Sequence, residues 1–213
     1  MMIEEPLFSL AGTPDADLER TGGMNVAVDE AFSGAVRIQL DDTSWIDHVQ
    51  GWLAGDSELM EALMKQAAWE QRSRWMYTRT VTEPRLTAEY PVIADAPQPV
   101  LHYLTEVLST QYGQPYSRLW MNWYRDNTDG TGWHADRPAN RLDGAVIPVL
   151  SLGATRRFLI RREGGGPSTP VVTHGGDLVV MGGRCQKDYV HSVPKQRQPA
   201  GARLSLNFSV AAS

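Results

Sequence analysis

The second half of the chain is a succession of short apolar segments interrupted by turn-forming residues. Gly, Pro and Asp cluster between these segments, which cover residues 119–124, 145–152, 157–160, 171–173, 178–181 and 203–210. Residues 163–167 (EGGGP) suit a hairpin turn. Apolar segments this short, bounded by turn signals, are typical of strands. The pattern predicts an antiparallel sandwich or jelly roll over about residues 117–210.

The first half carries helical signals instead. Residues 35–40 (AVRIQL) alternate and predict one strand. Two helical segments are expected after it, the second with Asp56 as its N-cap and with apolar residues at helical spacing up to Ala67. A further helix is expected over about residues 100–111, ending at Gly113. Helices followed by many short strands indicate an α+β fold.

The length of 213 residues suits one domain, at roughly 150 residues per domain. Residues 1–33 lack a clear period and are expected to form an N-terminal arm, with residues 34–213 as a single domain. No segment approaches the roughly 20 apolar residues of a membrane-spanning helix, so no membrane association is expected. The acidic N-terminus and the single cysteine, Cys185, lead us to expect a cytoplasmic protein without disulfides.

The balance of charge bears on possible partners. The chain has 20 basic and 25 acidic residues, a net charge of −5, which argues against tight nonspecific binding to duplex nucleic acid. A local basic groove stays possible because arginines cluster at Arg72, Arg74, Arg79 and Arg85 and again at Arg156, Arg157, Arg161 and Arg162.

His134 and Asp136 form an HxD pair within residues 132–136 (GWHAD). Residues two apart on a strand point to the same face, so both side chains can approach one ion. His191 is the best candidate for a third ligand. Two histidines and one carboxylate leave coordination positions open, as in non-haem Fe(II) oxygenases. We interpret the other histidines, His48, His102 and His174, as ordinary hydrogen-bonded residues.

The segment 203–210 (RLSLNFSV) alternates strictly between polar and apolar residues. Arg203, Ser205 and Asn207 therefore share one face, and burying such an arginine is costly unless an anion meets it. A dicarboxylate would supply that anion, because the guanidinium binds a carboxylate in a bidentate manner. Asn122 and Tyr124 repeat the pattern on the segment 119–124.

Taken together, these segments resemble the Fe(II)/2-oxoglutarate dioxygenases and, more closely, their AlkB branch of oxidative nucleobase dealkylases. The matching segments, in order, are residues 76–79 (MYTR), 84–86 (PRL), 122–126 (NWYRD), 132–136 (GWHAD), 151–153 (SLG), 175–181 (GGDLVVM), 191–195 (HSVPK) and 203–206 (RLSL). The resemblance spans about residues 69–208. It implies a double-stranded β-helix (jelly roll) core with N-terminal helices packed on one sheet, and a substrate-covering segment at about residues 69–95.

The resemblance also implies the cofactors and the chemistry. Fe(II) would be held by His134, Asp136 and His191, with 2-oxoglutarate and O2 as co-substrates and succinate and CO2 as products. The co-substrate contacts would come from Asn122, Tyr124, Arg203, Ser205 and Asn207. The substrate would be a methylated base in DNA or RNA, either single-stranded or flipped out of a duplex, which loses formaldehyde. Candidates for holding that base are Trp75, Tyr77, Arg79, Arg85 and Trp133.

One position departs from the family pattern. A second arginine normally lies six residues after the first, where this chain has Ser209. Another cation could substitute, with Arg197 or Arg125 the first candidates; the enzyme could be less efficient; or its chemistry could have changed. Two alternatives to base repair therefore stay open: an AlkB-like oxygenase of a small molecule or protein, and a binding module with a degraded site.

Overall fold

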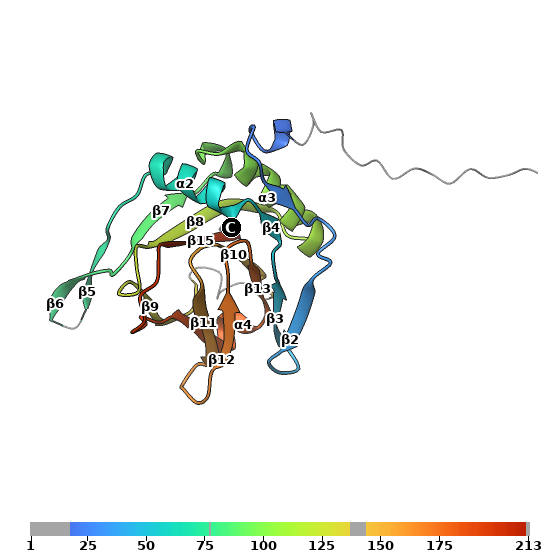
Figure 1. The fold of residues 1–213 in the computed structure, drawn as a ribbon. Coiled ribbons are helices and arrows are strands. Elements are labelled where there is room, and N and C mark those ends of the chain that lie inside the picture. The colour runs from blue at the N-terminus through green and yellow to red at the C-terminus, as the bar shows by residue number, and fades with distance from the viewer. Residues whose placement is uncertain (1–17, 77, 137–143, 212–213) are drawn as a thin grey trace, which may run out of the picture.

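Two antiparallel β-sheets face each other in the computed structural model, which describes residues 18–76, 78–136 and 144–211 (Figure 1). The larger sheet has the strand order β2-β3-β13-β10-β15-β8-β7. Its strands are β2 (Ala35–Gln39), β3 (Ser44–Val49), β13 (Leu178–Gly183), β10 (Ile147–Gly153), β15 (Arg203–Val210), β8 (Tyr116–Tyr124) and β7 (Leu86–Tyr90).

The smaller sheet has the order β12-β11-β14-β9. Its strands are β12 (Thr169–Thr173), β11 (Arg156–Arg162), β14 (Tyr189–Val193) and β9 (Thr131–His134). Two further strand pairs join β1 (Ala27–Val28) to β4 (Leu53–Ala54) and β5 (Ser73–Met76) to β6 (Arg79–Thr82), and the second pair projects from the body as a hairpin (Figure 1). The predicted α+β jelly roll is confirmed.

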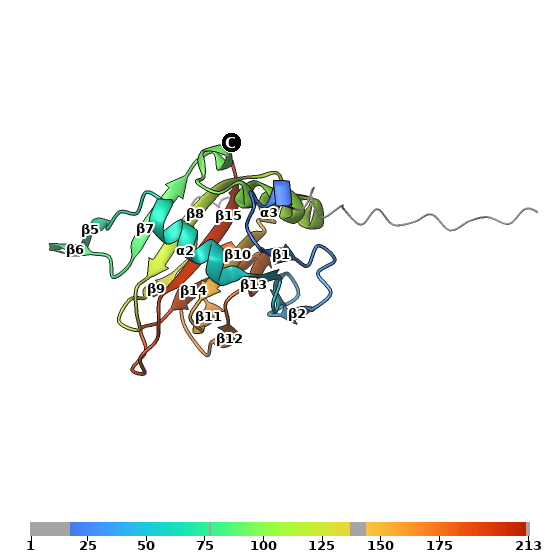
Figure 2. The same cartoon turned by 45° about the horizontal axis from the view of Figure 1, so that its top comes forward.

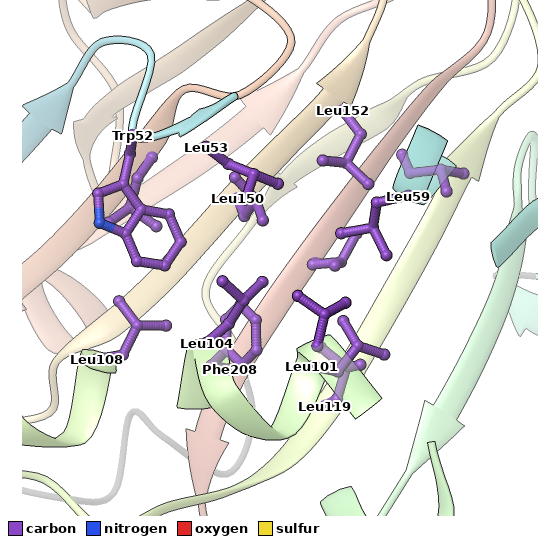
Figure 3. Packing of buried hydrophobic residues seen from close by; sticks show 14 of the residues in the cluster. Trp52, Leu53, Leu59, Leu101, Leu104, Leu108, Leu119, Leu150, Leu152 and Phe208 are labelled. Carbon is purple, nitrogen blue, oxygen red and sulfur yellow. The ribbon is translucent and has the colours of Figure 1, made fainter. Parts of the chain in front are cut away.

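Two helices, α2 (Asp56–Gln66) and α3 (Pro99–Tyr112), cover the outer face of the larger sheet (Figure 1, Figure 2). Their apolar stripes pack on the sheet, as Figure 3 shows for Leu59, Leu101 and Leu104, all fully buried. Burial of one such leucine contributes roughly 1.5–3 kcal/mol. Shorter helical turns lie at η1 (Ile93–Asp95) and α4 (Cys185–Asp188).

Strict alternation along β15 gives the strand one face in the hydrophobic core and one face toward a cavity. Leu204, Leu206 and Phe208 belong to the core under the helices. Arg203, Ser205 and Asn207 point the other way and line a cavity between the sheets. A second hydrophobic core, which includes Val149, Phe158 and Val179, fills the rest of that space.

The structure differs from the sequence-based expectation around residue 56. The helical segment expected between the first strand and α2 is instead strand β3, which pairs with both β2 and β13. The N-cap of α2 is Gly55, at φ 79°, and not Asp56. The Asp56 carboxylate is used elsewhere, because its Oδ2 accepts a hydrogen bond from the backbone N–H of Gly153 at 2.9 Å and so ties α2 to β10.

The part of the expected arm that the structure describes, residues 18–33, contributes to the core. Met24 and Phe32 are buried in the cluster beneath the helices, and β1 pairs with β4. The rest of the expected arm, residues 1–17, lies outside the described residues. Among the described helices, none has the length and apolar character needed to cross a membrane.

Candidate active site

The HxD pair and the distant His191 meet at neighbouring strands of the smaller sheet. His134 is the last residue of β9, and its Cα is paired in register with that of His191 on β14. Asp136 follows two residues after His134. The antiparallel pairing of β9 with β14 therefore brings the third residue of the predicted set beside the first two.

The side chains converge as the sequence predicts. Oδ1 of Asp136 lies 3.7 Å from Nε2 of His134 and 3.6 Å from Nε2 of His191. Among the described residues these three form one group whose candidate ligand atoms all lie within 4.8 Å of one another. Two imidazole nitrogens and one carboxylate oxygen at this spacing fit a single divalent ion with open coordination positions.

Neighbouring groups orient all three side chains. Nδ1 of His134 lies 2.9 Å from the backbone carbonyl oxygen of Gly132, and an Nδ1–H donated there leaves Nε2 unprotonated for a metal. The ring of His191 stacks on Phe158, with 5.3 Å between the ring centroids. Gln186, which is buried on α4, donates a hydrogen bond to Oδ2 of Asp136 and accepts one from its backbone N–H.

The electrostatics of the group favour binding of a cation. Burial would raise the pKa of Asp136, but the neighbouring His191 and His134 and the Gln186 amide outweigh it and hold that pKa at about 2. Burial, followed by the charge of His191, lowers the pKa of His134. The site therefore presents an ionised carboxylate and a neutral imidazole at neutral pH, the forms that bind metals.

A cavity that is partly open to solvent extends from these three residues between the two sheets. All five predicted co-substrate residues line it, together with Arg85 from the predicted substrate set. The side chains that the sequence analysis did not assign are Trp120, Thr131, Val149, Phe158 and Val193.

Arg203 is a buried cation without a described anionic partner. Its residue is 1% exposed, and only Nη2 has a described hydrogen-bond partner, Oγ of Ser151 at 2.8 Å. Nε and Nη1 find no partner among the described residues. The ring of Tyr124 lies beside the guanidinium, 5.3 Å from centroid to Cζ. Because a buried unpaired guanidinium is costly, this arrangement fits a site that receives a carboxylate.

The remaining co-substrate candidates form one hydrogen-bonded row. Nδ2 of Asn122 donates to Oγ of Ser205 at 3.0 Å, and Nδ2 of Asn207 lies 3.4 Å from the same oxygen. The hydroxyl of Tyr124 lies 2.9 Å from Oγ1 of Thr131. These polar groups lie on adjacent strands β8 and β15, as the alternation predicts, and provide hydrogen bonds along one wall of the cavity.

The predicted substrate residues are spread over three places. Arg85 lines the cavity. Trp75 and Arg79 lie on the β5–β6 hairpin, where their side chains are outside the described part of the structure, and Tyr77 lies outside the described residues. Trp133 is 38% exposed and is absent from the described cavity lining; its ring is covered by the guanidinium of Arg161, whose Cζ lies 4.0 Å from the centroid.

The sequence analysis did not identify three residues that lie at the site, Trp120, Phe158 and Gln186. Trp120 shares the inward face of β8 with Asn122 and Tyr124, so alternation alone could have identified it. Phe158 sits on an alternating strand as well, but such a residue is expected in any core. Gln186 carries no sequence signal, since its contact with Asp136 arises only because the fold brings α4 beside the segment that follows β9.

The surroundings of Ser209 bear on the missing second arginine. Ser209 is paired in register with Arg118 and lies beyond the described cavity lining, which ends along β15 at Asn207. Arg125, one of the expected substitutes, is engaged by Asp129 through two hydrogen bonds of 2.7 and 3.0 Å. Arg197, the other, is exposed and is likewise absent from the described lining.

Comparison with known proteins identifies a matching family and several similar proteins. The family model of the 2OG-Fe(II) oxygenase superfamily matches residues 48–208. The chain is 29% identical to an alpha-ketoglutarate-dependent dioxygenase alkB homolog 3 from Rattus norvegicus, over 96% of this chain and 70% of that protein. It is 29% identical to the DNA oxidative demethylase ALKBH2 of Homo sapiens, over 52% of this chain and 45% of that protein.

The fold agrees with solved structures. The structure of OsALKBH1 superimposes with a TM-score of 0.57 over 82% of this chain and 99% of that chain, at 14% identity. The site residues fit Fe(II) and 2-oxoglutarate, because the three ligand atoms converge and the buried guanidinium of Arg203 has N–H groups without described partners that a carboxylate could accept from. The chain belongs to the 2OG-Fe(II) oxygenase superfamily and is an Fe(II)- and 2-oxoglutarate-dependent dioxygenase of the AlkB type.

Proposed function

We propose that this protein removes methyl groups from the ring nitrogens of nucleic-acid bases by oxidation. The observation that carries the proposal is the cavity in which His134, Asp136 and His191 converge beside the unpaired, buried Arg203. The similarity to an alkB homolog 3 and to a DNA oxidative demethylase supports the same substrate class.

The triad would hold Fe(II), and the cavity wall would hold 2-oxoglutarate. Arg203 would bind the far carboxylate of the co-substrate, and Asn122, Tyr124, Ser205 and Asn207 would donate or accept hydrogen bonds along its length. With iron, 2-oxoglutarate and O2 bound, the site supplies an oxidant for a C–H bond while the co-substrate becomes succinate and CO2. Phe158 and Val193 line the same cavity and keep part of its wall apolar.

The reaction at the base uses both oxygen atoms of O2. One oxygen atom of O2 is inserted into a C–H bond of the N-methyl group, and the other enters succinate. The C–N bond of the resulting N-hydroxymethyl group then breaks, its electron pair stays on the ring nitrogen, and formaldehyde leaves as the hydroxyl proton is released. An N-methyl group on a base edge is inaccessible within a stacked duplex, so the substrate would be a single strand or a flipped-out base.

A turnover assay tests the proposal. Single-stranded oligonucleotides carrying N1-methyladenine or N3-methylcytosine are incubated with protein, Fe(II), 2-oxoglutarate and O2, and the unmethylated base, formaldehyde and succinate are measured. We expect equal amounts of the three products, and none with His191→Ala. The unmethylated oligonucleotide is the matched control substrate.

Two results would contradict base repair. Iron-dependent consumption of 2-oxoglutarate that the methylated oligonucleotide does not stimulate would indicate another substrate, a small molecule or a protein. Absence of any iron-dependent oxygen consumption would indicate a binding module without catalysis.

A further inference from the structure

We propose that Arg85 is the second cation of the co-substrate pocket and contacts the carboxylate at the keto-acid end of 2-oxoglutarate, while Arg203 binds the opposite carboxylate. This inference rests on the proposed function. It assigns Arg85 to the co-substrate, whereas the sequence pattern places it among the residues that hold the base. It also explains how the pocket can supply a second positive charge although position 209 is a serine.

The charged side chains of the cavity lining suit a ligand with two carboxylates. Among the described residues, Arg85 and Arg203 are the two cationic side chains of the lining, and Asp136 is the one carboxylate. 2-Oxoglutarate carries two carboxylates, one at each end. Arg203 can meet one of them, and a second charged partner within the same cavity is found at Arg85.

Contacts on the cavity wall fix the position of Arg85. Its Nε donates to Oδ1 of Asn122 at 2.8 Å, and Asn122 in turn donates to Ser205. The guanidinium is therefore joined to the row of polar groups proposed to hold the co-substrate. The side chain of Arg85 is 13% exposed, so its charge is screened less by water than a surface charge would be.

The two arginines lie at different places along this wall. Asn122, which accepts from Arg85, is opposite Ser205 in register, whereas Arg203 is opposite Tyr124, two residues further along β8. Arg85 lines the same cavity as the converging residues His134, Asp136 and His191. The keto-acid end of the co-substrate would lie beside these three residues, within the cavity that Arg85 faces.

The guanidinium keeps hydrogen-bond capacity for a ligand. One N–H is used by Asn122, and Nη2 lies 3.1 Å from a carboxylate oxygen of Glu83. Arg has five N–H donors, so three stay available for an incoming carboxylate. Arg125 and Arg118 differ from Arg85 in that they are absent from the described cavity lining; Arg125 pairs with Asp129, and Arg118 lies 3.5 Å from Glu89.

Binding measurements with truncated ligands can separate the two ends of the pocket. Calorimetric titrations use protein loaded with Mn(II) and two ligands: 2-oxoglutarate, and 2-oxobutanoate, which keeps the keto-acid end but lacks the far carboxylate. We expect Arg85→Gln to weaken both ligands by the same factor, roughly ten- to hundred-fold for one charge-assisted contact. Arg203→Met should weaken 2-oxoglutarate alone.

Two variants distinguish a charge contact from a merely structural role of Arg85. Arg85→Lys keeps the charge but loses the fixed Nε geometry toward Asn122, and it should retain most of the affinity. If Arg85→Lys binds 2-oxoglutarate as weakly as Arg85→Gln does, the affinity depends on the hydrogen bond to Asn122 and not on the charge, which overturns the proposal. Arg118→Gln removes a nearby arginine from the same wall of strands but outside the described lining, and should bind both ligands as the parent does.

The remaining outcomes are also decisive. Unchanged affinity of Arg85→Gln for 2-oxoglutarate, or weakening that spares 2-oxobutanoate, overturns the assignment of Arg85 and leaves the proposed function standing. Failure of the parent protein with Mn(II) to bind 2-oxoglutarate would overturn the proposed function itself, and this inference with it.

Discussion

Gln186 holds Asp136 from two sides: its amide oxygen accepts the backbone N–H of Asp136 at 2.8 Å, and its amide nitrogen donates to Oδ2 at 3.2 Å. This leaves Oδ1 as the oxygen that faces both histidines. Gln186 is 2% exposed and comes from α4, far along the chain from the HxD pair. It is a positioning residue for the carboxylate ligand.

Replacement of Gln186 by methionine should weaken metal binding without unfolding the protein. Methionine keeps the length of the side chain but neither hydrogen bond, so Asp136 can rotate away from the histidines. We expect roughly ten- to hundred-fold weaker Mn(II) binding, as is usual when such a supporting residue is lost. Calorimetric titration measures it, with the same substitution at the exposed Gln50 as control; equal affinities of the two variants would contradict the role of Gln186.

Replacement of Arg203 by methionine should stabilise the ligand-free protein and abolish most co-substrate binding. Burial lowers the pKa of Arg203 well below its ordinary value, to about 10. Because the folded pKa is below the unfolded one, the charged arginine destabilises the fold at every pH below about 10, by about 3 kcal/mol. We expect a higher melting temperature for Arg203→Met at pH 7.

Addition of 2-oxoglutarate with Mn(II) gives the second half of this test. The ligand should raise the melting temperature of the parent protein, since it binds only the folded state, and should leave that of Arg203→Met nearly unchanged. A variant that is less stable than the parent and still stabilised by 2-oxoglutarate would refute both statements.

The stacked pair of Trp133 and Arg161 should contribute to binding of single-stranded nucleic acid. The indole is partly exposed next to His134, Arg161 makes no ion pair among the described residues, and its Nε has no described hydrogen-bond partner. Stacking of one base contributes roughly 1–3 kcal/mol, so Trp133→Ala should weaken oligonucleotide binding about tenfold or more. Fluorescence anisotropy with a labelled oligonucleotide measures this effect.

A similar pair elsewhere provides the control for that experiment. Arg37 lies over Trp45 with 3.8 Å between Cζ and the ring centroid, on strands β2 and β3 at one edge of the larger sheet, whereas Trp133 and Arg161 belong to the smaller sheet. Arg161→Gln should weaken oligonucleotide binding and Arg37→Gln should not. Equal losses would show that the loss reflects net charge and not a local surface.

The thiol of Cys185 should react slowly in the native protein. Burial raises its pKa to about 11, and the sulfur donates to the backbone carbonyl of Trp45. At pH 8 the thiolate fraction is then on the order of 100-fold lower than for a thiol with a pKa of 9, and access is restricted as well. Iodoacetamide labelling followed by mass spectrometry should show fast modification only after unfolding.

The sequence by itself determined which side chains of the segment 203–210 lie in the core and which face the cavity. The alternation in residues 203–210 separates Arg203, Ser205 and Asn207 from the leucines beside them, because successive side chains on a strand point to opposite sides. The HxD spacing likewise placed His134 and Asp136 together. These are local consequences of backbone geometry, so a linear pattern suffices to predict them.

The tertiary structure decided what lies opposite those faces. Register between β9 and β14 brings His191 to His134, the packing of α4 brings Gln186 to Asp136, and a hydrogen bond to Asn122 brings Arg85 into the cavity. The conversion of the expected first helix into β3 has the same origin, since that segment gains partners on both sides in the larger sheet. Contacts between residues far apart in the chain depend on register and packing, and local propensity contains no information about either.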